Sequence, residues 1–232
     1  MSCPVQEPTE EDPMMEQTAK TILKRITVSR SERRLSGLAF SSSLQSEFDE
    51  LVEVVSSNPT IVNKKYGPRQ GTLLHRCAEN NRPKFVEFLI QQGAVQTFDV
   101  HGNYPLHYAA INGGRWVAEI LVSEGADIEV KNFEDETPLN LAASCGNLDL
   151  VNFLIDSGAK TFSRGYAGNS PLHSAAEGGQ LQVLQELVEQ HGFNVDMLNN
   201  KEETALHHAS SNPNGLKCVE YLLEEGANIR AM

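Results

Sequence analysis

The chain of 232 residues has a formal charge of −12, and 40% of its residues are hydrophobic but only 6% aromatic. This acidic balance argues against a nucleic-acid partner, because phosphates need a basic protein surface. Four widely spaced cysteines without a C-x-x-C pair indicate neither a disulfide framework nor a zinc site, and they favour a reducing compartment, the cytoplasm or also the nucleus.

The chain shows no sequence signal for export or membrane insertion. Its first residues are acidic, whereas a signal peptide is basic and then apolar. No apolar run approaches the roughly 18 residues that a membrane-spanning helix needs. We therefore expect no insertion into a membrane.

Residues 1–45 have the composition of a disordered tail that is acidic and then basic. Five acids and no base fall within residues 1–19, whereas residues 20–36 carry six bases and one acid. Residues 14–28 could form a weak amphipathic helix, because apolar side chains lie three or four positions apart. These side chains are Met15, Ala19, Ile22 and Ile26.

Two short matches in the tail predict phosphorylation. Arg33-Arg34-Leu35-Ser36 fits the pattern of a basophilic kinase site, and Lys24-Arg25-Ile26-Thr27 fits it more loosely. A phosphate on Ser36 or Thr27 would offset the positive charge around it. One hypothesis is that residues 20–36 fold back on the acidic part of the chain and that phosphorylation loosens this contact.

Ordered structure is expected to begin near Ser46 with a capping half-repeat over residues 46–66. Apolar residues there lie on one face of a helix: Phe48, Leu51, Val52, Val54 and Val55. Asn58-Pro59 should end this helix, since a residue before proline disfavours the helical conformation. The segment is similar to the second helix of the units that follow it.

A heptad then recurs five times, beginning at residues 72, 104, 137, 170 and 204, in steps of 32, 33, 33 and 34 residues. The heptads read T-L-L-H-R-C-A, Y-P-L-H-Y-A-A, T-P-L-N-L-A-A, S-P-L-H-S-A-A and T-A-L-H-H-A-S. A hydroxyl residue at the first position can cap a helix, and proline suits the first helical position. Each heptad should therefore begin a short helix, followed by a turn and a second helix that stops at a glycine. The stopping glycines are Gly93, Gly125, Gly158, Gly192 and Gly226.

A period near 33 residues with T-P-L-H-x-A, a glycine turn and a Gly-Ala stop resembles the ankyrin repeat. The resemblance implies an all-α solenoid of helix-turn-helix repeats with short hairpin-like finger loops and a concave surface. Stacked repeats bury a core that no single repeat could bury. Five repeats are expected over residues 67–98, 99–131, 132–164, 165–198 and 199–232.

The heptads also predict the core, and the repeats depart from the family pattern at several positions, two of which lie in the third repeat. The heptad leucines and small residues should be buried, among them Leu74, Leu106, Leu139, Leu172, Leu206 and the pairs from Ala109/Ala110 to Ala209/Ser210. Asp135 stands where a finger usually has glycine, and Asn140 replaces the usual histidine.

Histidine recurs at the fourth heptad position, in His75, His107, His173 and His207. A metal ladder or a catalytic set is one interpretation. Equivalent positions of packed helices lie about 8–10 Å apart, however, whereas zinc needs its ligands about 2 Å from one ion. We favour a structural role in bonding backbone groups. Nucleophile, phosphate-loop and metalloprotease motifs are lacking, so we expect no metal, no cofactor and no enzymatic activity.

What remains is a partner-binding surface, which the resemblance places at the fingertips and at the C-terminal ends of the first helices. The candidate residues are Val100, His101, Asn103, Ile111, Asn112, Phe133, Glu134, Glu136, Ser144, Tyr166, Asn169, Glu177, Lys201 and Glu203. Exposed aromatic rings flanked by acids suit a protein partner with apolar anchors and basic residues. The alternative is that Phe133 and Tyr166 brace neighbouring fingers.

The expected function is protein–protein recognition, as an adaptor, scaffold or inhibitor that holds a partner on the concave surface. An alternative is the N-terminal regulatory domain, or a short isoform, of a larger enzyme or channel. An inhibitor of a transcription factor is a third interpretation, but the D-S-G-x-x-S motif of that class is missing from this sequence.

Overall fold

The computed structural model describes residue 21, residues 42–162 and residues 164–229. The proposed phosphorylation sites Ser36 and Thr27, and nearly all of the expected tail, lie outside the described residues. The described part of the chain thus comprises the repeats and the helix before them.

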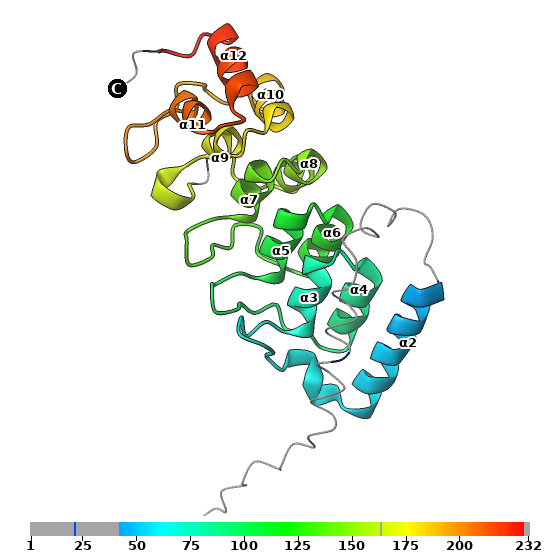
Figure 1. Ribbon diagram of the computed structural model, residues 1–232. Coiled ribbons are helices and arrows are strands. Elements are labelled where there is room, and N and C mark those ends of the chain that lie inside the picture. Colours follow the sequence, from blue (N-terminus) through cyan, green and yellow to red (C-terminus); the bar gives the residue numbers. More distant parts are fainter. Residues whose placement is uncertain (1–20, 22–41, 163, 230–232) are drawn as a thin grey trace, which may run out of the picture.

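The described chain is a row of helix pairs connected by extended loops, and it contains no β-strand (Figure 1). In chain order the elements are α2 (Ser42–Ser57), the 3-10 helix η2 (Pro59–Asn63), α3 (Leu73–Glu79), α4 (Pro83–Gln91), α5 (Pro105–Asn112), α6 (Arg115–Ser123), α7 (Pro138–Ser144), α8 (Leu148–Asp156), the 3-10 helix η3 (Tyr166–Gly168), α9 (Pro171–Glu177), α10 (Leu181–Glu189), α11 (Ala205–Ser211) and α12 (Leu216–Glu224). The predicted all-α repeat solenoid is confirmed.

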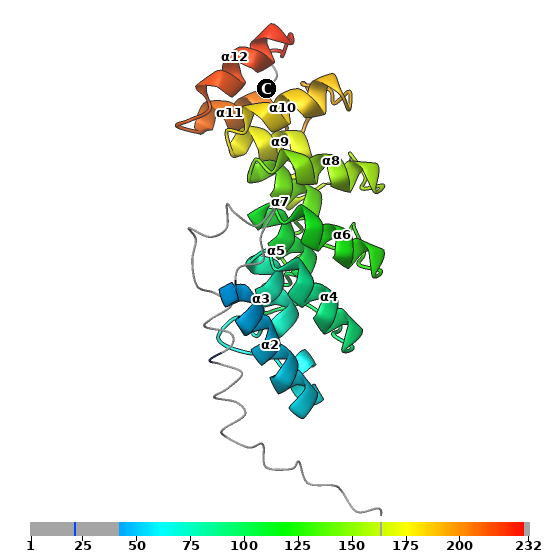
Figure 2. The ribbon, with the colours of Figure 1, turned by 90° about the vertical axis from the view of Figure 1, so that its right-hand side faces the viewer.

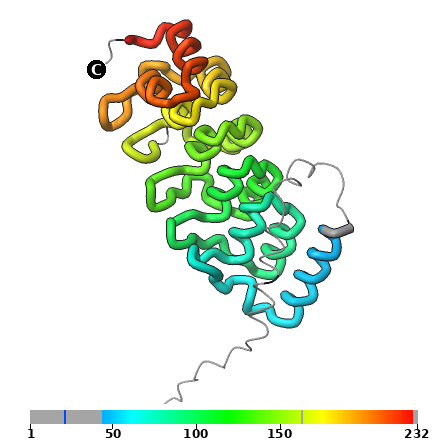
Figure 3. Tube along the Cα trace, in the orientation of Figure 1, coloured from blue at the N-terminus to red at the C-terminus, as the bar shows by residue number. Residues whose placement is uncertain are grey.

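The first and second helices of the repeats form two parallel rows. The first helices, from α3 to α11, pack on one another, and so do the second helices, from α4 to α12. Figure 2 shows the second helices projecting to one side of the row of first helices. The finger loops extend from the first helices, away from the second helices, as the chain trace shows in Figure 3.

The predicted helix boundaries follow from proline and glycine. Helices α5, α7 and α9 begin at the heptad prolines, whose fixed backbone angle is already helical. The second helices end just before glycines in the left-handed conformation, such as Gly93 at φ +83° and Gly158 at φ +96°. A side chain there would strain the backbone, so the Gly-Ala stops are confirmed.

The core runs without interruption along the row. Leu106, Leu139 and Leu172 are at most 1% exposed, and the small pairs Ala109/Ala110 and Ala142/Ala143 are fully buried. Small residues let the first helices approach closely, and the leucines fill the space beside them.

The last repeat differs from the expected core. Leu206 is only half-buried and Ser210 is exposed, so the prediction of a buried Ser210 is wrong. Helix α11 packs on α9 and α12, but no described residue covers its remaining face. The same heptad positions are buried in the repeats whose first helix has a successor.

Helix α2 caps the other end of the row. It begins at Ser42, earlier than the expected start at residue 46, and it ends at Ser57, as Asn58-Pro59 predicts. The ring of Phe48 packs edge-on against Phe85 and Phe88 of α4, with ring centres 5.2 and 5.6 Å apart. These contacts cover the outer helix of the first repeat.

Four fingers are closed five-residue loops, and the first is a six-residue loop closed by the Tyr66 N–H and the Gly71 carbonyl. In the second and third repeats the first N–H donates to the carbonyl of the fifth residue, over 3.1 Å in both (Asp99 to Asn103, Asn132 to Glu136). Neighbouring fingers are paired as well, since the Phe133 N–H donates to the His101 carbonyl at 3.0 Å. The backbone thus holds consecutive fingertips side by side.

Candidate protein-binding surface

An aspartate or asparagine opens three of the fingers and sets their shape. One carboxylate oxygen of Asp99 accepts the N–H groups of His101 and Asn103, at 2.8 and 3.0 Å. Asn132 and Asn199 do the same in their fingers with their amide oxygens. Sequence reasoning missed these residues, although their fixed place five residues before the heptad could have revealed them.

The heptad histidines join each repeat to the next finger. In His107, Nδ1 accepts the Tyr104 N–H at 3.0 Å, and Nε2 lies 3.0 Å from the Glu136 carbonyl. His173 bonds the Ser170 N–H and the Glu203 carbonyl in the same way. Because Nδ1 accepts, the hydrogen-bond pattern assigns the proton to Nε2, which donates to the carbonyl.

This arrangement explains why the histidines recur. Both ring nitrogens of His107 and His173 are used by backbone groups, so neither has a lone pair free for a metal. Asn140 supports the structural role, because its amide nitrogen donates to the Asn169 carbonyl at 3.1 Å in the same place. Within the described ranges no group of three or more His, Cys, Asp or Glu side chains could hold an ion.

Burial controls the protonation of these rings. Loss of solvent lowers the pKa of His107 and of His173 to about 4, although the hydrogen bonds to the next finger oppose the shift. Burial lowers the pKa of His75 too. The rings are therefore neutral at physiological pH and act as fixed donors between repeats.

Two predicted aromatic residues lie exposed on the fingers. Phe133 is 69% exposed and Tyr166 is 60% exposed. The Phe133 ring also contacts Phe98, with ring centres 5.7 Å apart, and the Lys201 ammonium lies 5.8 Å from the centre of the Tyr166 ring. Each ring thus contacts a neighbouring side chain and still keeps more than half of its surface exposed.

Phe98 is an exposed aromatic residue that sequence reasoning missed. It precedes the second finger and contacts both Tyr104 and Phe133. The equivalent residues before three other fingers are cations, Lys65, Lys131 and Arg164, each of which donates to a carbonyl of the next repeat. Because three equivalent residues are cations, the apolar residue at this position was the sequence signal that could have revealed Phe98. Together with exposed Val100 and Ile111, it widens the apolar area around Phe133.

Three predicted asparagines are used inside the protein. Asn169 is 4% exposed, and its amide oxygen accepts from Asn199 at 2.8 Å, so the prediction of a contact residue is wrong there. Half-buried Asn103 accepts from Asn132 at 2.9 Å, and Asn112 donates to the carbonyl of Tyr108 at 3.0 Å. Polar side chains in fingers satisfy their own backbone first.

Glu136 is turned towards the fourth finger. Its carboxylate accepts the Tyr166 N–H at 3.0 Å, and burial raises its pKa. Gly165 opens that finger, and a Cβ there would lie 2.6 Å from the other Glu136 oxygen. Glycine thus leaves room for a carboxylate that orients the Tyr166 backbone. Glu136 therefore supports the neighbouring finger that carries Tyr166.

Ser144 belongs to a second type of inter-repeat contact. It is half-buried, and its carbonyl accepts from the Gln180 amide at 3.2 Å. Asn147 and Asn212 likewise donate to carbonyls at the end of the preceding first helix. These amides satisfy helix-terminal carbonyls that would otherwise lack a donor.

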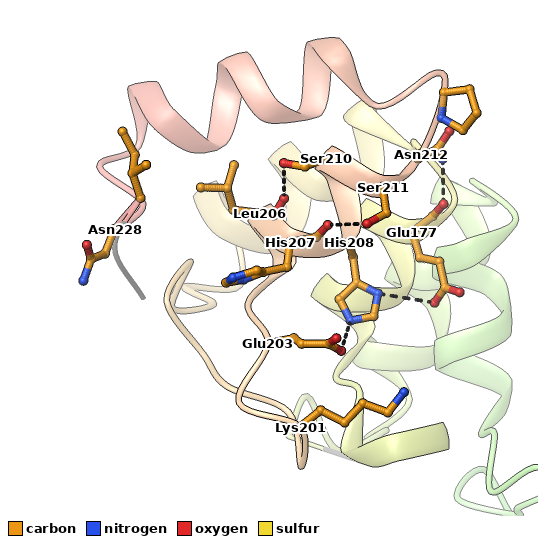
Figure 4. A pocket seen from close by; sticks show the side chains of 12 residues that line it. Glu177, Lys201, Glu203, Leu206, His207, His208, Ser210, Ser211, Asn212 and Asn228 are labelled. Atoms are coloured by element: carbon orange, nitrogen blue, oxygen red, sulfur yellow. Dashed lines mark hydrogen bonds and ion pairs between the residues drawn. The ribbon is translucent and has the colours of Figure 1, made fainter. Parts of the chain in front are cut away.

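The remaining predicted residues are charged and more accessible. His101 and Glu134 are exposed on the second and third fingers. Glu177, Lys201 and Glu203 come together around a hollow of about 860 Å3 at the last repeat (Figure 4). The hollow is also lined by Leu206, His207, His208, Ser210, Ser211, Asn212, Pro213, Asn228 and Ile229.

His208 lies between two carboxylates in this hollow. Its Nδ1 is 3.7 Å from Glu177 and its Nε2 is 3.5 Å from Glu203. The Asn199 amide donates to Glu203 at 3.0 Å and holds the pKa of that carboxyl below its usual value. The site therefore presents negative charge to solvent.

The two serines of the hollow are bonded within their own helix. The hydroxyls of Ser210 and Ser211 donate to carbonyls of their own helix, at 2.7 and 3.0 Å. Neither serine is bonded to His208, so the described lining residues contain no nucleophile paired with a base. Two carboxylates beside Leu206 instead suit a basic side chain with an apolar stem.

None of the helices in the described ranges has both the length and the apolar character needed to cross a membrane.

The family model for ankyrin repeats (3 copies) matches residues 41–132 and 139–232. No curated protein sequence matches the chain. Ankyrin repeats are in general protein–protein interaction modules, and they are typically without catalytic activity. The heptads, the paired helices, the fingers and the family match together show that the chain belongs to the ankyrin-repeat family.

Proposed function

We propose that the chain binds a partner protein on the surface formed by its fingertips and the C-terminal ends of its first helices, as an adaptor, scaffold or inhibitor. The observation that carries the proposal is the exposure of Phe133 and Tyr166 on adjacent repeats. Large exposed rings held on a rigid backbone are typical anchors of protein interfaces.

The surroundings of the two rings define the partner's chemistry. Val100, Ile111 and Phe98 make the N-terminal end of the surface apolar, and Glu177 and Glu203 make its C-terminal end acidic. A partner with apolar anchors followed by basic side chains would complement this order. The acidic balance of the chain supports a protein partner rather than nucleic acid.

We further propose that binding involves no covalent chemistry and takes place in the cytoplasm or nucleus. Among the described residues Cys77, Cys145 and Cys218 are unpaired, which supports a reducing compartment. Burial raises the pKa of the Cys77 thiol to about 12. Such a thiol is a poor nucleophile at neutral pH.

The test is affinity capture from a cell extract with wild type beside the Phe133→Ala/Tyr166→Ala double variant. Proteins held by wild type but lost by the variant are purified, and their dissociation constants are measured. We expect at least a tenfold weaker affinity for the variant, since interface aromatic anchors each contribute about 1–2 kcal/mol or more.

Phe162→Ala is the matched control. Phe162 is as exposed as Phe133, at 69%, but it precedes the fourth finger instead of lying on a fingertip. Partners that depend on the proposed surface should bind this control like wild type. Equal loss in the control and the double variant would reject the proposed surface in favour of non-specific hydrophobic retention.

A further inference from the structure

Trp116 is the single tryptophan of the chain, and it is 63% exposed on the side opposite to the fingers. It lies in the first turn of α6, where the other second helices have polar residues. Those residues are Lys84, Asp149, Gln182 and Lys217. The surface proposed above for partner binding does not include Trp116.

A hollow of about 430 Å3 lies beside this ring. It is lined by Trp116, Glu119, Ile120 and Ser123 of α6 and by Pro83 at the start of α4. The α6 residues are three, four and seven positions apart, so they form one stripe of the helix. Figure 2 shows α4 and α6 side by side in the row of second helices.

The same stripe of α4 is packed from outside at one residue, Phe88, while Lys84, Glu87 and Gln91 of this stripe are exposed. Phe88 takes the place on α4 that Ile120 takes on α6, one repeat later. The Phe48 ring of α2 packs against Phe88, with ring centres 5.6 Å apart. A segment N-terminal to the repeats thus already contacts the outer face of α4 at Phe88, whereas no described residue covers the hollow on α6.

The chain just before α2 starts close to this hollow. Phe48 contacts Phe85, which lies two residues after Pro83 at the edge of the hollow. Ser42 is six helical residues before Phe48, about 9 Å along the axis. Residues 35–41 can extend a further 24 Å or so. This reach is sufficient for the segment to cross from α2 to α6.

The segment also has the matching chemistry. Residues 35–40 read Leu-Ser-Gly-Leu-Ala-Phe, and Arg33 and Arg34 precede them. Three large apolar side chains fit a hollow between a tryptophan and an isoleucine, and two cations complement the exposed carboxylate of Glu119. Glycine at position 37 lets the chain turn over the helix.

We propose that residues 35–40, which lie outside the described part of the chain, dock on the Trp116 hollow. Leu38 and Phe40 pack on Trp116 and Ile120, and Arg33 and Arg34 face Glu119. The contact extends the cap that α2 forms on α4 to the next outer helix. It is independent of partner binding on the fingers.

Ser36 makes this contact open to regulation. A basophilic kinase transfers the γ-phosphoryl group of ATP to the Ser36 hydroxyl oxygen, which loses its proton, and ADP leaves. The phosphate adds about −1.5 to −2 charges beside Glu119 and offsets the neighbouring arginines. Phosphorylation releases the segment from the hollow.

Fluorescence of the single tryptophan tests the contact directly. Acrylamide quenching is measured on the full chain and on the Leu38→Asp/Phe40→Asp variant. We expect the quenching constant of the variant to be at least twice that of wild type, with a red-shifted emission. Both substitutions lie outside the repeats, so circular dichroism should show an unchanged helix content.

Ile22→Asp/Ile26→Asp is the matched control, because it changes the other apolar part of the tail. Its quenching constant should equal that of wild type. A rise with this control alone, or no rise with Leu38→Asp/Phe40→Asp, overturns the proposal. Protection that disappears on dilution of wild type also overturns it, since a second copy would then be the occupant.

Quenching of the chain phosphorylated at Ser36 is a second, independent experiment. Full chain treated with a basophilic kinase and verified by mass spectrometry as phosphorylated at Ser36 should quench like the Leu38→Asp/Phe40→Asp variant. Ser36→Ala under the same treatment should quench like untreated wild type. Equal quenching of the phosphorylated and unphosphorylated chains would reject the regulatory role of Ser36.

Discussion

The heptads of the fourth and fifth repeats share a hydroxyl residue, a leucine and a histidine at the same positions but differ in what surrounds these residues. His173 and Leu172 are fully buried, whereas His207 is exposed and Leu206 is half-buried. Both histidines accept the N–H of the first heptad residue through Nδ1. Only His173 also reaches a carbonyl of a following finger, that of Glu203. The heptad therefore shapes its own helix, but its burial depends on the next repeat.

This difference separates two contributions of the heptad to the free energy of unfolding. Capping is local to one repeat and is the same in both. Burial of the leucine and the hydrogen bond to the next finger belong to the interface between repeats. Variants at interior positions, compared with the same change in the last repeat, should isolate the interface term.

Acidification should give the largest effect, because it acts on several interior histidines at once. His107 and His173 have pKa values of about 4 in the folded chain, against 6.5 for an unperturbed histidine. The unfolded chain therefore binds more protons between pH 6.5 and 4, and the stability that neutral rings provide above pH 6.5 is lost as the pH falls. From pH 7 to 5 we expect a loss of about 2 kcal/mol for each histidine, or about 4 kcal/mol together.

Urea unfolding between pH 7 and 5 measures this loss. The His107→Asn/His173→Asn variant is the control, because Asn140 fills the same role in the third repeat without titrating in this range. Its stability should change much less over this pH range. Equal pH dependence in wild type and variant would show that other groups control the acid response; Glu136, whose pKa burial raises, should act in the opposite direction.

His107→Ala should lower the free energy of unfolding by about 3 kcal/mol. It removes a buried ring, leaves the Tyr104 N–H without its partner and costs the Glu136 carbonyl one of its two donors, the other being the Asn132 N–H. His207→Ala should cost about 1 kcal/mol, since it loses only the local cap. Urea unfolding at pH 7 measures both. Equal losses at the two positions would contradict the importance of the next finger.

Ala143→Leu should cost about 2 kcal/mol through overpacking, because Ala143 is fully buried between first helices. Ser210→Leu is the matched change at the equivalent, exposed position of the last repeat, and should stay within about 0.5 kcal/mol of wild type. Thermal melts compare the two. A large loss from Ser210→Leu would mean that this face of α11 is covered in solution.

Much of the fold could be predicted because local signals agree with one another, although proline begins the first helix in only three of the five repeats. Proline at the helix start, glycine at the helix stop and leucine inside the heptad all indicate the same boundaries. Asp135 stands where a finger usually has glycine, and its φ of +60° is the left-handed conformation that glycine adopts most readily. The error at Ser210 arose because a repeat pattern does not say whether a neighbour covers it.

The candidate surface was less predictable than the fold. Phe133 and Tyr166 lie exposed on fingers as expected, but Asn169 is buried and Glu136 supports the neighbouring finger. Fingers are short loops with many backbone groups to satisfy, so their polar side chains turn inwards. The residue type alone does not distinguish such a side chain from one that faces a partner.

The amino-acid sequence by itself determined the repeat period, the helix boundaries and the family, because the period is visible in the order of residues and each boundary depends on a few adjacent residues. Tertiary structure alone decided which copies of a motif are buried, which carbonyl each histidine reaches and which polar side chains remain accessible. These properties depend on the neighbouring repeat, whose contacts involve residues about thirty positions away in the chain. Four of the five heptads carry the same histidine, and the neighbouring repeat makes it a buried bridge or an exposed side chain.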